Sequence, residues 1–244
     1  MRKVLITGGS EGIGYALAEC FAADGYHVIL AARTKAKLEA AKEKLQAAYG
    51  CSVDVISVDL SEPGCGRRLF DLAGRVDVLV NNAGIGYTGR AEENAARQEE
   101  MVNVNVRAVV SLCAVYLDDM KKAHKGTIVN IASTGAFQPG PYIACYYASK
   151  AFVSSYTEAL HEEAKAYGVH VCCVYPGPTA TAFYEKSGVQ PSPFVHAAEE
   201  VAKAAYARMF AGKRVIIGIR DRLALFVPGP LRTAFIRRSK QKLL

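Results

Sequence analysis

The chain has 244 residues, the size of one large α/β domain, and can bury most of the surface that its unfolded form exposes. With 51% apolar and 22% charged residues, its composition is that of a soluble globular protein. No signal-peptide core follows Met1, and the seven cysteines and five histidines are scattered without disulfide or zinc spacing, so we expect a cytoplasmic protein with no metal site.

The net charge of +7 is concentrated at the C-terminal end of the chain. Residues 213–244 carry nine Lys or Arg residues and one acid, Asp221, which leaves residues 1–212 with a charge of −1. We predict a domain over residues 1–219 and a basic, apolar tail over residues 220–244. Two interpretations of the tail stay open. It either packs across a subunit interface, which we favour, or makes peripheral contact with a membrane, since its apolar run is too short to span a bilayer.

A glycine-rich turn follows the first predicted strand, Lys3–Thr7. It has the sequence Thr-Gly-Gly-Ser-Glu-Gly-Ile-Gly over residues 7–14 and leads into an alanine-rich helix that we expect to end near Asp24. Glycines let a backbone turn tightly and approach a pyrophosphate, whose charge is favoured at the amino terminus of a helix. The strand, turn and helix together predict a nucleotide-binding turn.

The second predicted strand, His27–Ala32, ends without an acidic residue. In sites selective for NAD an acid near this point binds the ribose 2′-hydroxyl, whereas an arginine accommodates the 2′-phosphate of NADP. Arg33 and Thr34 follow the strand here, and a helix over Lys35–Tyr49 comes next. An arginine offers a planar donor that is always charged, so the sequence favours NADP over NAD.

Two further strands are predicted before the middle of the chain. Val53–Val58 runs into Asp59 and Leu60, and Val76–Val80 runs into the turn Asn-Asn-Ala-Gly at residues 81–84. Asn and Gly at the carboxyl end of a strand suit a turn that a ligand approaches closely. The pattern fits either such a contact or an ordinary turn.

A long helix is predicted from about Ala95 to His124. Its largely apolar face, Met101–Tyr116, contains Asn103 and Asn105. A buried amide needs hydrogen-bond partners, so we expect one of the two to bond to backbone or water near the cleft. The helical period does not decide which.

A third stretch offers three polar side chains to one cleft. Ser133 follows the strand Thr127–Ile131, and open α/β sheets bind their ligands at the carboxyl ends of strands. Tyr146 and Lys150 are four residues apart, on one face of the helix Tyr146–Tyr167. A lysine cation lowers the pKa of a nearby phenol from about 10 and makes it a usable proton donor or acceptor. The trio suits interconversion of a carbonyl and an alcohol, where a proton moves at oxygen while a hydride moves at carbon.

The remainder of the chain continues the alternation of strands and helices. A strand is predicted over Val169–Val174, a lid over the loop Phe183–Val195, a helix over Ala197–Ala211 and a last strand over Val215–Ile219. No repeat or low-complexity linker interrupts this pattern. Seven strands arranged in this way predict a single α/β domain with a Rossmann-like, doubly wound parallel sheet flanked by helices.

Taken together, the motifs resemble those of the classical short-chain dehydrogenases/reductases, from Lys3 to about Ile219. The resemblance rests on Thr7, Gly8, Gly12 and Gly14, on Asp59, on the turn at residues 81–84, on Asn105, Ser133, Tyr146 and Lys150, and on Pro176, Gly177 and Thr181. It implies that Tyr146 is the general acid in reduction and the base in oxidation, and that Ser133 positions the substrate oxygen. Lys150 would lower the Tyr146 pKa and hold the nicotinamide ribose, and Asn105 would hold a water of the proton relay.

The resemblance also implies a set of cofactor contacts. These are Gly8, Ser10, Glu11, Gly12, Ile13 and Gly14 at the pyrophosphate turn, Arg33 and Thr34 at the 2′-phosphate, Asp59 and Leu60 at the adenine, Asn82, Ala83 and Gly84 along the adenosine half, and Pro176, Gly177, Thr179 and Thr181 with Tyr146 and Lys150 towards the nicotinamide. Two positions depart from the family pattern. Glu11 stands where NADP-using members often have a basic residue, and would repel a phosphate unless it points away. Thr179 replaces an aliphatic residue.

We therefore predict an NADP(H)-dependent oxidoreductase acting on an apolar carbonyl or secondary alcohol of lipid, steroid or acyl type, because residues 135–145 and the lid offer mostly apolar walls. The alternative is a cofactor-binding regulatory protein without catalysis. The tail matches no nucleic-acid-reading module, so we expect no nucleic-acid partner. Because the family commonly assembles through the two helices that match 95–124 and 146–167, the resemblance implies a homodimer or homotetramer.

Overall fold

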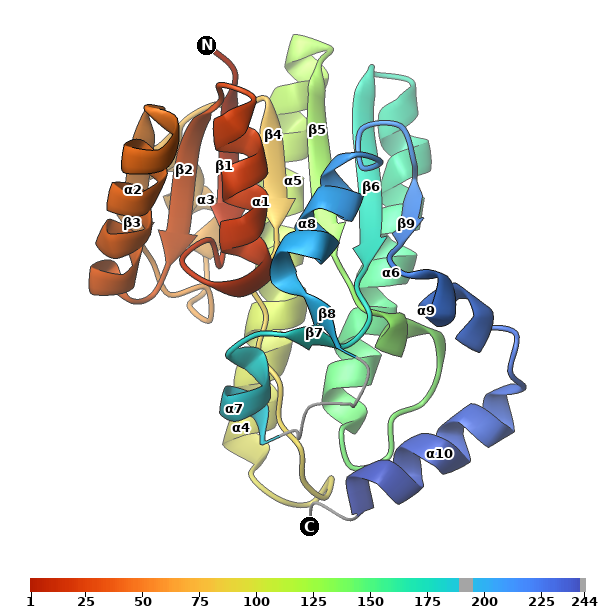
Figure 1. Ribbon diagram of the computed structural model, residues 1–244. Coiled ribbons are helices and arrows are strands. Elements are labelled where there is room, and N and C mark those ends of the chain that lie inside the picture. The colour runs from red at the N-terminus through yellow and green to blue at the C-terminus, as the bar shows by residue number, and fades with distance from the viewer. Residues whose placement is uncertain (189–194, 242–244) are drawn as a thin grey trace.

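Seven parallel strands form the central sheet of the computed structural model, which describes residues 1–188 and 195–241 (Figure 1). In the order in which they lie side by side, the strands are β3 (Val53–Ser57), β2 (His27–Ala32), β1 (Lys3–Thr7), β4 (Val78–Asn81), β5 (Gly126–Ile131), β6 (Val169–Tyr175) and β9 (Arg214–Ile216). The order reverses between β1 and β4, and doubly wound sheets bind their ligands outside the carboxyl ends of the strands at such a point. The predicted sheet is confirmed.

Alternate residues of the strands fill two separate cores, one on each face of the sheet. Along β1, Val4 and Ile6 belong to one core and Leu5 belongs to the other, and all three are completely buried. A strand that is buried on both faces needs apolar side chains at every position. This explains why β1 is an unbroken apolar run rather than an alternation of apolar and polar residues.

Helices cover both faces of the sheet (Figure 1). The face with Val4 and Ile6 is covered by α1 (Gly12–Ala23), α2 (Lys35–Tyr49) and α8 (Ala198–Tyr206). The opposite face is covered by α3 (Cys65–Ala73), α5 (Ala108–Ala123) and α6 (Ala144–Lys165).

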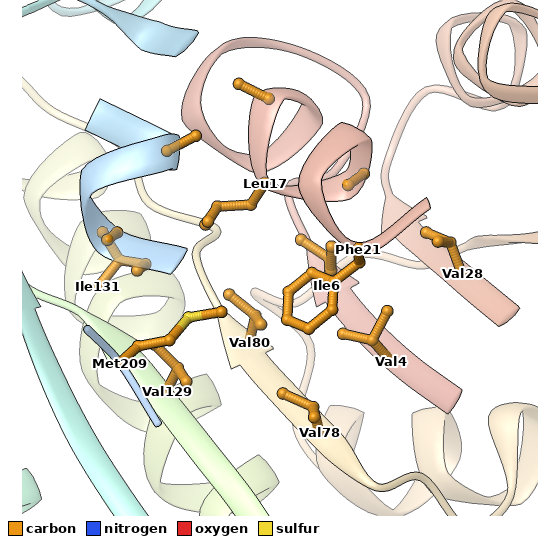
Figure 2. Close-up of a cluster of buried hydrophobic side chains, with 14 of the residues drawn as sticks. Val4, Ile6, Leu17, Phe21, Val28, Val78, Val80, Val129, Ile131 and Met209 are labelled. Carbon is orange, nitrogen blue, oxygen red and sulfur yellow. The ribbon is translucent and has the colours of Figure 1, made fainter. Parts of the chain in front are cut away.

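Figure 2 shows how the first core closes over the middle of the sheet. Phe21 of α1 lies against Val4 and Ile6 of β1, and Met209, which follows α8, lies close to Val129 of β5. Each of these side chains is completely buried, and burying an apolar side chain of this size contributes roughly 1.5–3 kcal/mol relative to leaving it exposed. The packing holds α1, and with it the glycine-rich turn, against the carboxyl end of β1.

One π-helical turn interrupts the long helix of the second face. α4 (Ala95–Val102) continues into the π-helical segment η1 (Asn103–Arg107) and then into α5. By length and hydropathy the combined helix Ala95–Ala123 could cross a membrane, yet half of its most apolar window is buried inside the protein. We interpret it as a core helix, and π-helical turns within such helices are frequent at functional sites.

Two predicted elements end earlier than expected. The strand predicted over Val215–Ile219 is β9, which ends at Ile216, and the positive φ of +86° at Gly218 then turns the chain away from the sheet. The helix predicted over Ala197–Ala211 is α8, which ends at Tyr206. The residues that follow form tighter turns on the way to β9.

The predicted tail is helical where the structure describes it. It consists of α9 (Ile219–Ala224) and α10 (Gly229–Gln241), and α10 lies beyond the carboxyl ends of the strands, next to the amino-terminal end of α6 (Figure 1). The short helix α7 (Phe183–Ser187) and the two-stranded sheet of β7 (Thr179–Ala180) and β8 (His196–Ala197) lie at the same end. The predicted lid therefore begins as helix α7, and its residues 189–194 lie outside the described residues.

Candidate active site

A cavity of about 1210 Å³ opens at the carboxyl ends of the strands. Its walls come from the turns after β1 to β6 and from α6, α7 and α10. The predicted site residues all line it, with two exceptions, Gly14 and Asn105. The structure thus brings together on one surface positions that lie far apart in the sequence.

The turns after β1 and β4 are joined by a set of short hydrogen bonds. The hydroxyl of Thr7 accepts hydrogen bonds from the backbone N–H groups of Asn82 and Ala83, at 3.0 and 3.1 Å. The Asn82 amide donates to the carbonyls of Thr7 and Gly8, at 3.0 and 3.1 Å. A β-carbon at Gly14 would lie only 2.3 Å from the Gly8 carbonyl oxygen. Gly14 therefore serves the close packing of the turn rather than contact with a ligand.

This glycine-rich turn fits a nicotinamide dinucleotide. Gly8 and Gly12 have φ values of +65° and +59°, which glycine adopts without strain. The turn opens directly into α1, whose amino-terminal N–H groups can receive a pyrophosphate. The residues that would hold such a cofactor are therefore present, from Gly8 at one end to Thr181 at the other.

Ser133, Tyr146 and Lys150 meet at the cavity beside the end of β5. Ser133 begins the short helix η2 (Thr134–Phe137), and its hydroxyl also forms a hydrogen bond with Tyr146. Lys150 is 5% exposed, and its ammonium donates to the Ile131 carbonyl at 2.8 Å. The trio predicted from sequence is thus assembled on one wall of the cavity.

The pKa of Tyr146 differs in direction from the prediction. Burial raises it above the ordinary value of 10.0, and the hydrogen bond with Ser133 opposes this rise. Lys150 lies 5.8 Å from the centre of the Tyr146 ring and directs its ammonium to the Ile131 carbonyl. The expectation that the lysine lowers the tyrosine pKa is therefore wrong for this structure, in which burial of the phenol sets the direction of the shift and Lys150 is not among its causes.

Asn105, in the π-helical turn, is the buried amide that the helical period left undecided. It is 1% exposed, and its side chain makes two hydrogen bonds with the backbone of Ile85, both at 2.9 Å. Its amide also donates to the Ser149 hydroxyl at 3.1 Å, which in turn donates to the Tyr146 carbonyl at 2.7 Å. Asn105 therefore connects the turn after β4 to the helix that carries Tyr146.

The turn after β2 holds more charge than the sequence analysis identified. Arg33 pairs with Glu100 at 2.9 Å, and Arg97 pairs with the other oxygen of the same carboxylate at 2.8 Å. Glu11, which was expected to repel a phosphate, pairs instead with Lys37 at 2.8 Å. Lys37 and Arg97 also line the cavity and were missed. Lys37 could have been found, because it lies one helical turn after Arg33.

Aromatic side chains surround Tyr146. The ring centres of Phe183 and Tyr147 lie 5.2 and 6.1 Å from that of Tyr146, and Tyr184 lines the same cavity. Residues of α10 line the same cavity, although they belong to the predicted tail. No local sequence signal marks them as wall residues, because their position depends on where the C-terminal helix packs. The division of the chain at residue 219 stays a prediction.

We expect the buried Lys150 to make stability depend on pH. Burial lowers the pKa of Lys150 from 10.5 to about 8, so between these values the unfolded chain binds more protons than the folded one. The contribution of Lys150 to the free energy of unfolding therefore rises with pH in this window. Lys150→Met removes the buried charge and should raise the free energy of unfolding below pH 8. Above pH 8 this gain should fall by about 1 kcal/mol per pH unit. Urea unfolding from pH 7 to 10 measures the free energy of unfolding of both proteins. An exposed control, Lys125→Met, should show no such trend, and a difference independent of pH would contradict the argument.

The family model of the short chain dehydrogenases matches residues 2–191. Among curated proteins, hydroxysteroid dehydrogenase-like protein 1 of Gallus gallus is 33% identical over 87% of this chain and 67% of its own length. The 3-ketodihydrosphingosine reductase of Bacteroides thetaiotaomicron is 34% identical over 76% of this chain and 67% of its own length.

Solved structures agree with the sequence comparisons. A short-chain dehydrogenase from Sphingobium yanoikuyae in complex with NADPH has a TM-score of 0.84 and 28% identity, over 97% of this chain and 95% of that chain. A short-chain dehydrogenase/reductase from Burkholderia phymatum in complex with NAD has a TM-score of 0.84 and 25% identity, over 92% and 91% of the two chains. With the assembled cavity and its serine, tyrosine and lysine, these matches show that the chain belongs to the short-chain dehydrogenases/reductases, oxidoreductases that act on carbonyl and alcohol groups with a nicotinamide cofactor.

Proposed function

We propose that this protein is an NADP(H)-dependent oxidoreductase that interconverts a carbonyl and a secondary alcohol on an apolar substrate. One observation carries the proposal: the hydrogen-bonded pair of Ser133 and Tyr146, both partly buried, lies on the wall of a cavity large enough for a dinucleotide and a second molecule. A purely regulatory cofactor-binding protein would not need this pair, so the arrangement favours an enzyme.

Each of the four predicted catalytic residues has a distinct role in the proposal. The cofactor, when bound, supplies or accepts the hydride. Ser133 holds the substrate oxygen by a hydrogen bond, and Tyr146 gives that oxygen its proton in reduction and removes it in oxidation. Lys150 provides a buried cation for the nicotinamide ribose. Asn105 is a positioning residue, because its amide is already bonded to Ile85 and Ser149.

Two observations support an apolar substrate. The wall next to Tyr146 is aromatic, with Phe183, Tyr147 and Tyr184 beside it. Such side chains offer large apolar surface at a small entropic cost. The similar proteins described above include a hydroxysteroid dehydrogenase-like protein and a 3-ketodihydrosphingosine reductase, whose names refer to apolar molecules.

The choice of NADP rests on the charges after β2. Arg33 and Lys37 line the cavity and no acid ends the strand, which favours a 2′-phosphate over a 2′-hydroxyl. Their pairing with Glu100 and Glu11 reduces the preference, because a phosphate must compete with these carboxylates. One similar structure holds NADPH and another holds NAD, so the comparisons do not distinguish the two cofactors. The preference for NADP is inferred from the charged side chains alone.

Tyr146→Phe should lower kcat by about 10²–10⁴-fold, because general acid catalysis typically contributes that much. Cofactor affinity should stay the same, since only the proton-transferring hydroxyl is removed. The measurement is steady-state reduction of a panel of ketones, followed by NADPH absorbance, with fluorescence titration of NADPH. Tyr147→Phe removes a neighbouring hydroxyl from the same wall and serves as the matched control. A kcat within about threefold of the parent would remove Tyr146 from the mechanism.

Arg33→Ala should weaken NADPH binding by about 1–2 kcal/mol and leave NADH binding nearly unchanged. The estimate is below that of a fully buried charge-assisted bond, because Arg33 is about half exposed and shares Glu100 with Arg97. Isothermal titration with both cofactors gives the result. Arg67→Ala, which removes an exposed ion pair on α3, is the control. Equal losses for NADPH and NADH would contradict the assignment.

For the tail we propose packing across a subunit interface of a cytoplasmic homodimer or homotetramer. Leu223, Phe226 and Leu231 are 60, 84 and 63% exposed, which is unusual for side chains of this size on adjacent segments. Peripheral contact with a membrane is the alternative, since basic residues lie between them.

The double variant Leu223→Ser, Phe226→Ser should reduce the oligomeric mass measured by light scattering. The exposed Leu72 of α3 provides the control variant Leu72→Ser. The parent should stay in the supernatant when sedimented with anionic vesicles at low salt. Sedimentation with the vesicles, lost in the double variant without any change of mass, would favour the membrane instead.

A further inference from the structure

The C-terminal half of helix α10 lines the active-site cavity. Ile236 and Lys240 are four residues apart, so they share one face of the helix, and both are partly buried. The other lining residues of α10, Phe235, Arg238 and Ser239, are exposed. The guanidinium of Arg232 donates to the Gln138 side chain at 2.9 Å, which joins the helix to the segment after η2. This hydrogen bond therefore connects the amino-terminal half of α10 to the body of the protein.

The part of α10 that lines the cavity is both apolar and cationic. Phe235 and Ile236 provide the apolar part, and Arg238, Ser239 and Lys240 follow within the next turn. Figure 1 shows α10 beyond the carboxyl ends of the strands, towards the edge of the sheet formed by β9, whereas β2 and β3 form the opposite edge. The cations of α10 therefore come from a different element than Arg33, which follows β2.

No acidic side chain in the described part of the chain balances these two cations. The acids that line the cavity are Glu11 and Asp59, from the turns after β1 and β3. Glu11 pairs with Lys37 at 2.8 Å, and Asp59 accepts a hydrogen bond from the Ser61 N–H at 2.8 Å.

Lys240 is also partly removed from water. Burial lowers the pKa of Lys240 below its ordinary value, which shows that its charge is disfavoured where it stands. Within residues 1–188 and 195–241, no carboxylate forms an ion pair with Lys240 or Arg238. A desolvated cation without a partner is unfavourable, and an anion brought by a ligand would relieve that penalty.

We propose that Lys240 and Arg238 bind an anionic group of the substrate, so that the substrate is an amphiphile with a carbonyl or alcohol, an apolar body and a carboxylate or phosphate at the end that reaches α10. The inference rests on the proposed function and names its substrate class. The aromatic wall at Tyr147 and Phe183 receives the apolar body, and Phe235 and Ile236 of α10 line the same cavity. α10 is thus a specificity-determining element of the tail.

The test compares an oxo fatty acid of medium chain length with its methyl ester, which differs only in charge at the far end. For the parent, kcat/KM should favour the acid by roughly 10-fold, the effect of one charge-assisted contact that is partly exposed to water. Lys240→Met keeps the apolar stem and should remove most of this preference. Arg238→Met should reduce the preference by a smaller factor.

Two control variants separate charge recognition from structural damage. Lys240→Arg restores the cation and should restore the preference. Arg237→Met removes a cation from the same helix that lies outside the cavity lining and should leave it unchanged. The proposal is overturned if the parent reduces acid and ester equally well, or if Lys240→Met and Arg238→Met both keep the parent ratio.

A binding measurement reads the same preference without turnover. Dodecanoate should bind to the parent roughly 10-fold more tightly than dodecanol in isothermal titration at low salt, and the difference should shrink at 0.5 M NaCl because salt screens the contact. Lys240→Met should bind the two alike. If neither oxo compound is reduced yet dodecanoate is preferred, the catalytic proposal fails and the recognition stands. If dodecanol binds as tightly as dodecanoate, the recognition is wrong whatever the enzyme reduces.

Discussion

The site depends first on the junction between the turns after β1 and β4. Thr7 and Asn82 exchange hydrogen bonds across it. The start of α1 lies so close to the Gly8 carbonyl that position 14 has no room for a side chain. Because β1 and β4 are neighbours whose connections run to opposite sides, their ends separate into a crevice, and this junction holds its floor together. A ligand can then contact backbone on both sides of the crevice without any rearrangement of the strands.

A second constraint is the satisfaction of polar groups buried beside the crevice. The Asn81 amide donates to the Asn130 side chain at 2.8 Å, and the Asn130 amide donates to the Thr157 hydroxyl at 2.9 Å. Asn105 makes the parallel connection from Ile85 to Ser149. Buried amides destabilise a fold unless they are paired, so each pair tolerates little displacement of its partners. α6, which carries Tyr146 and Lys150, is joined in this way to β5 and to the turn after β4.

The charged side chains that line the cavity differ from one part of it to another. Towards β2 and β3, cations and carboxylates are paired, as in Arg33 with Glu100 and Lys37 with Glu11. In the middle, the phenol of Tyr146 and the ammonium of Lys150 are both disfavoured as ions, because burial raises the pKa of the first and lowers that of the second. The pKa of Lys150 therefore moves towards neutrality, whereas that of Tyr146 moves away from it. The phenol stays protonated, as a proton donor in reduction requires.

The amino-acid sequence by itself determined the sheet, because strands buried on both faces need unbroken apolar runs, and it located Ser133, Tyr146 and the glycine-rich turn by local spacing. It did not determine what depends on contacts between distant segments. The hydrogen bonds of Asn105, the pairing of Glu11 with Lys37 and the direction of the Tyr146 pKa shift are all set by neighbours from other elements. The same holds for α10: its sequence predicts a basic, apolar segment, and only its packing through Arg232 against Gln138 makes that segment a wall of the cavity. Periodicity reports which face of a helix is apolar, whereas burial and charge pairing exist only once the chain has folded.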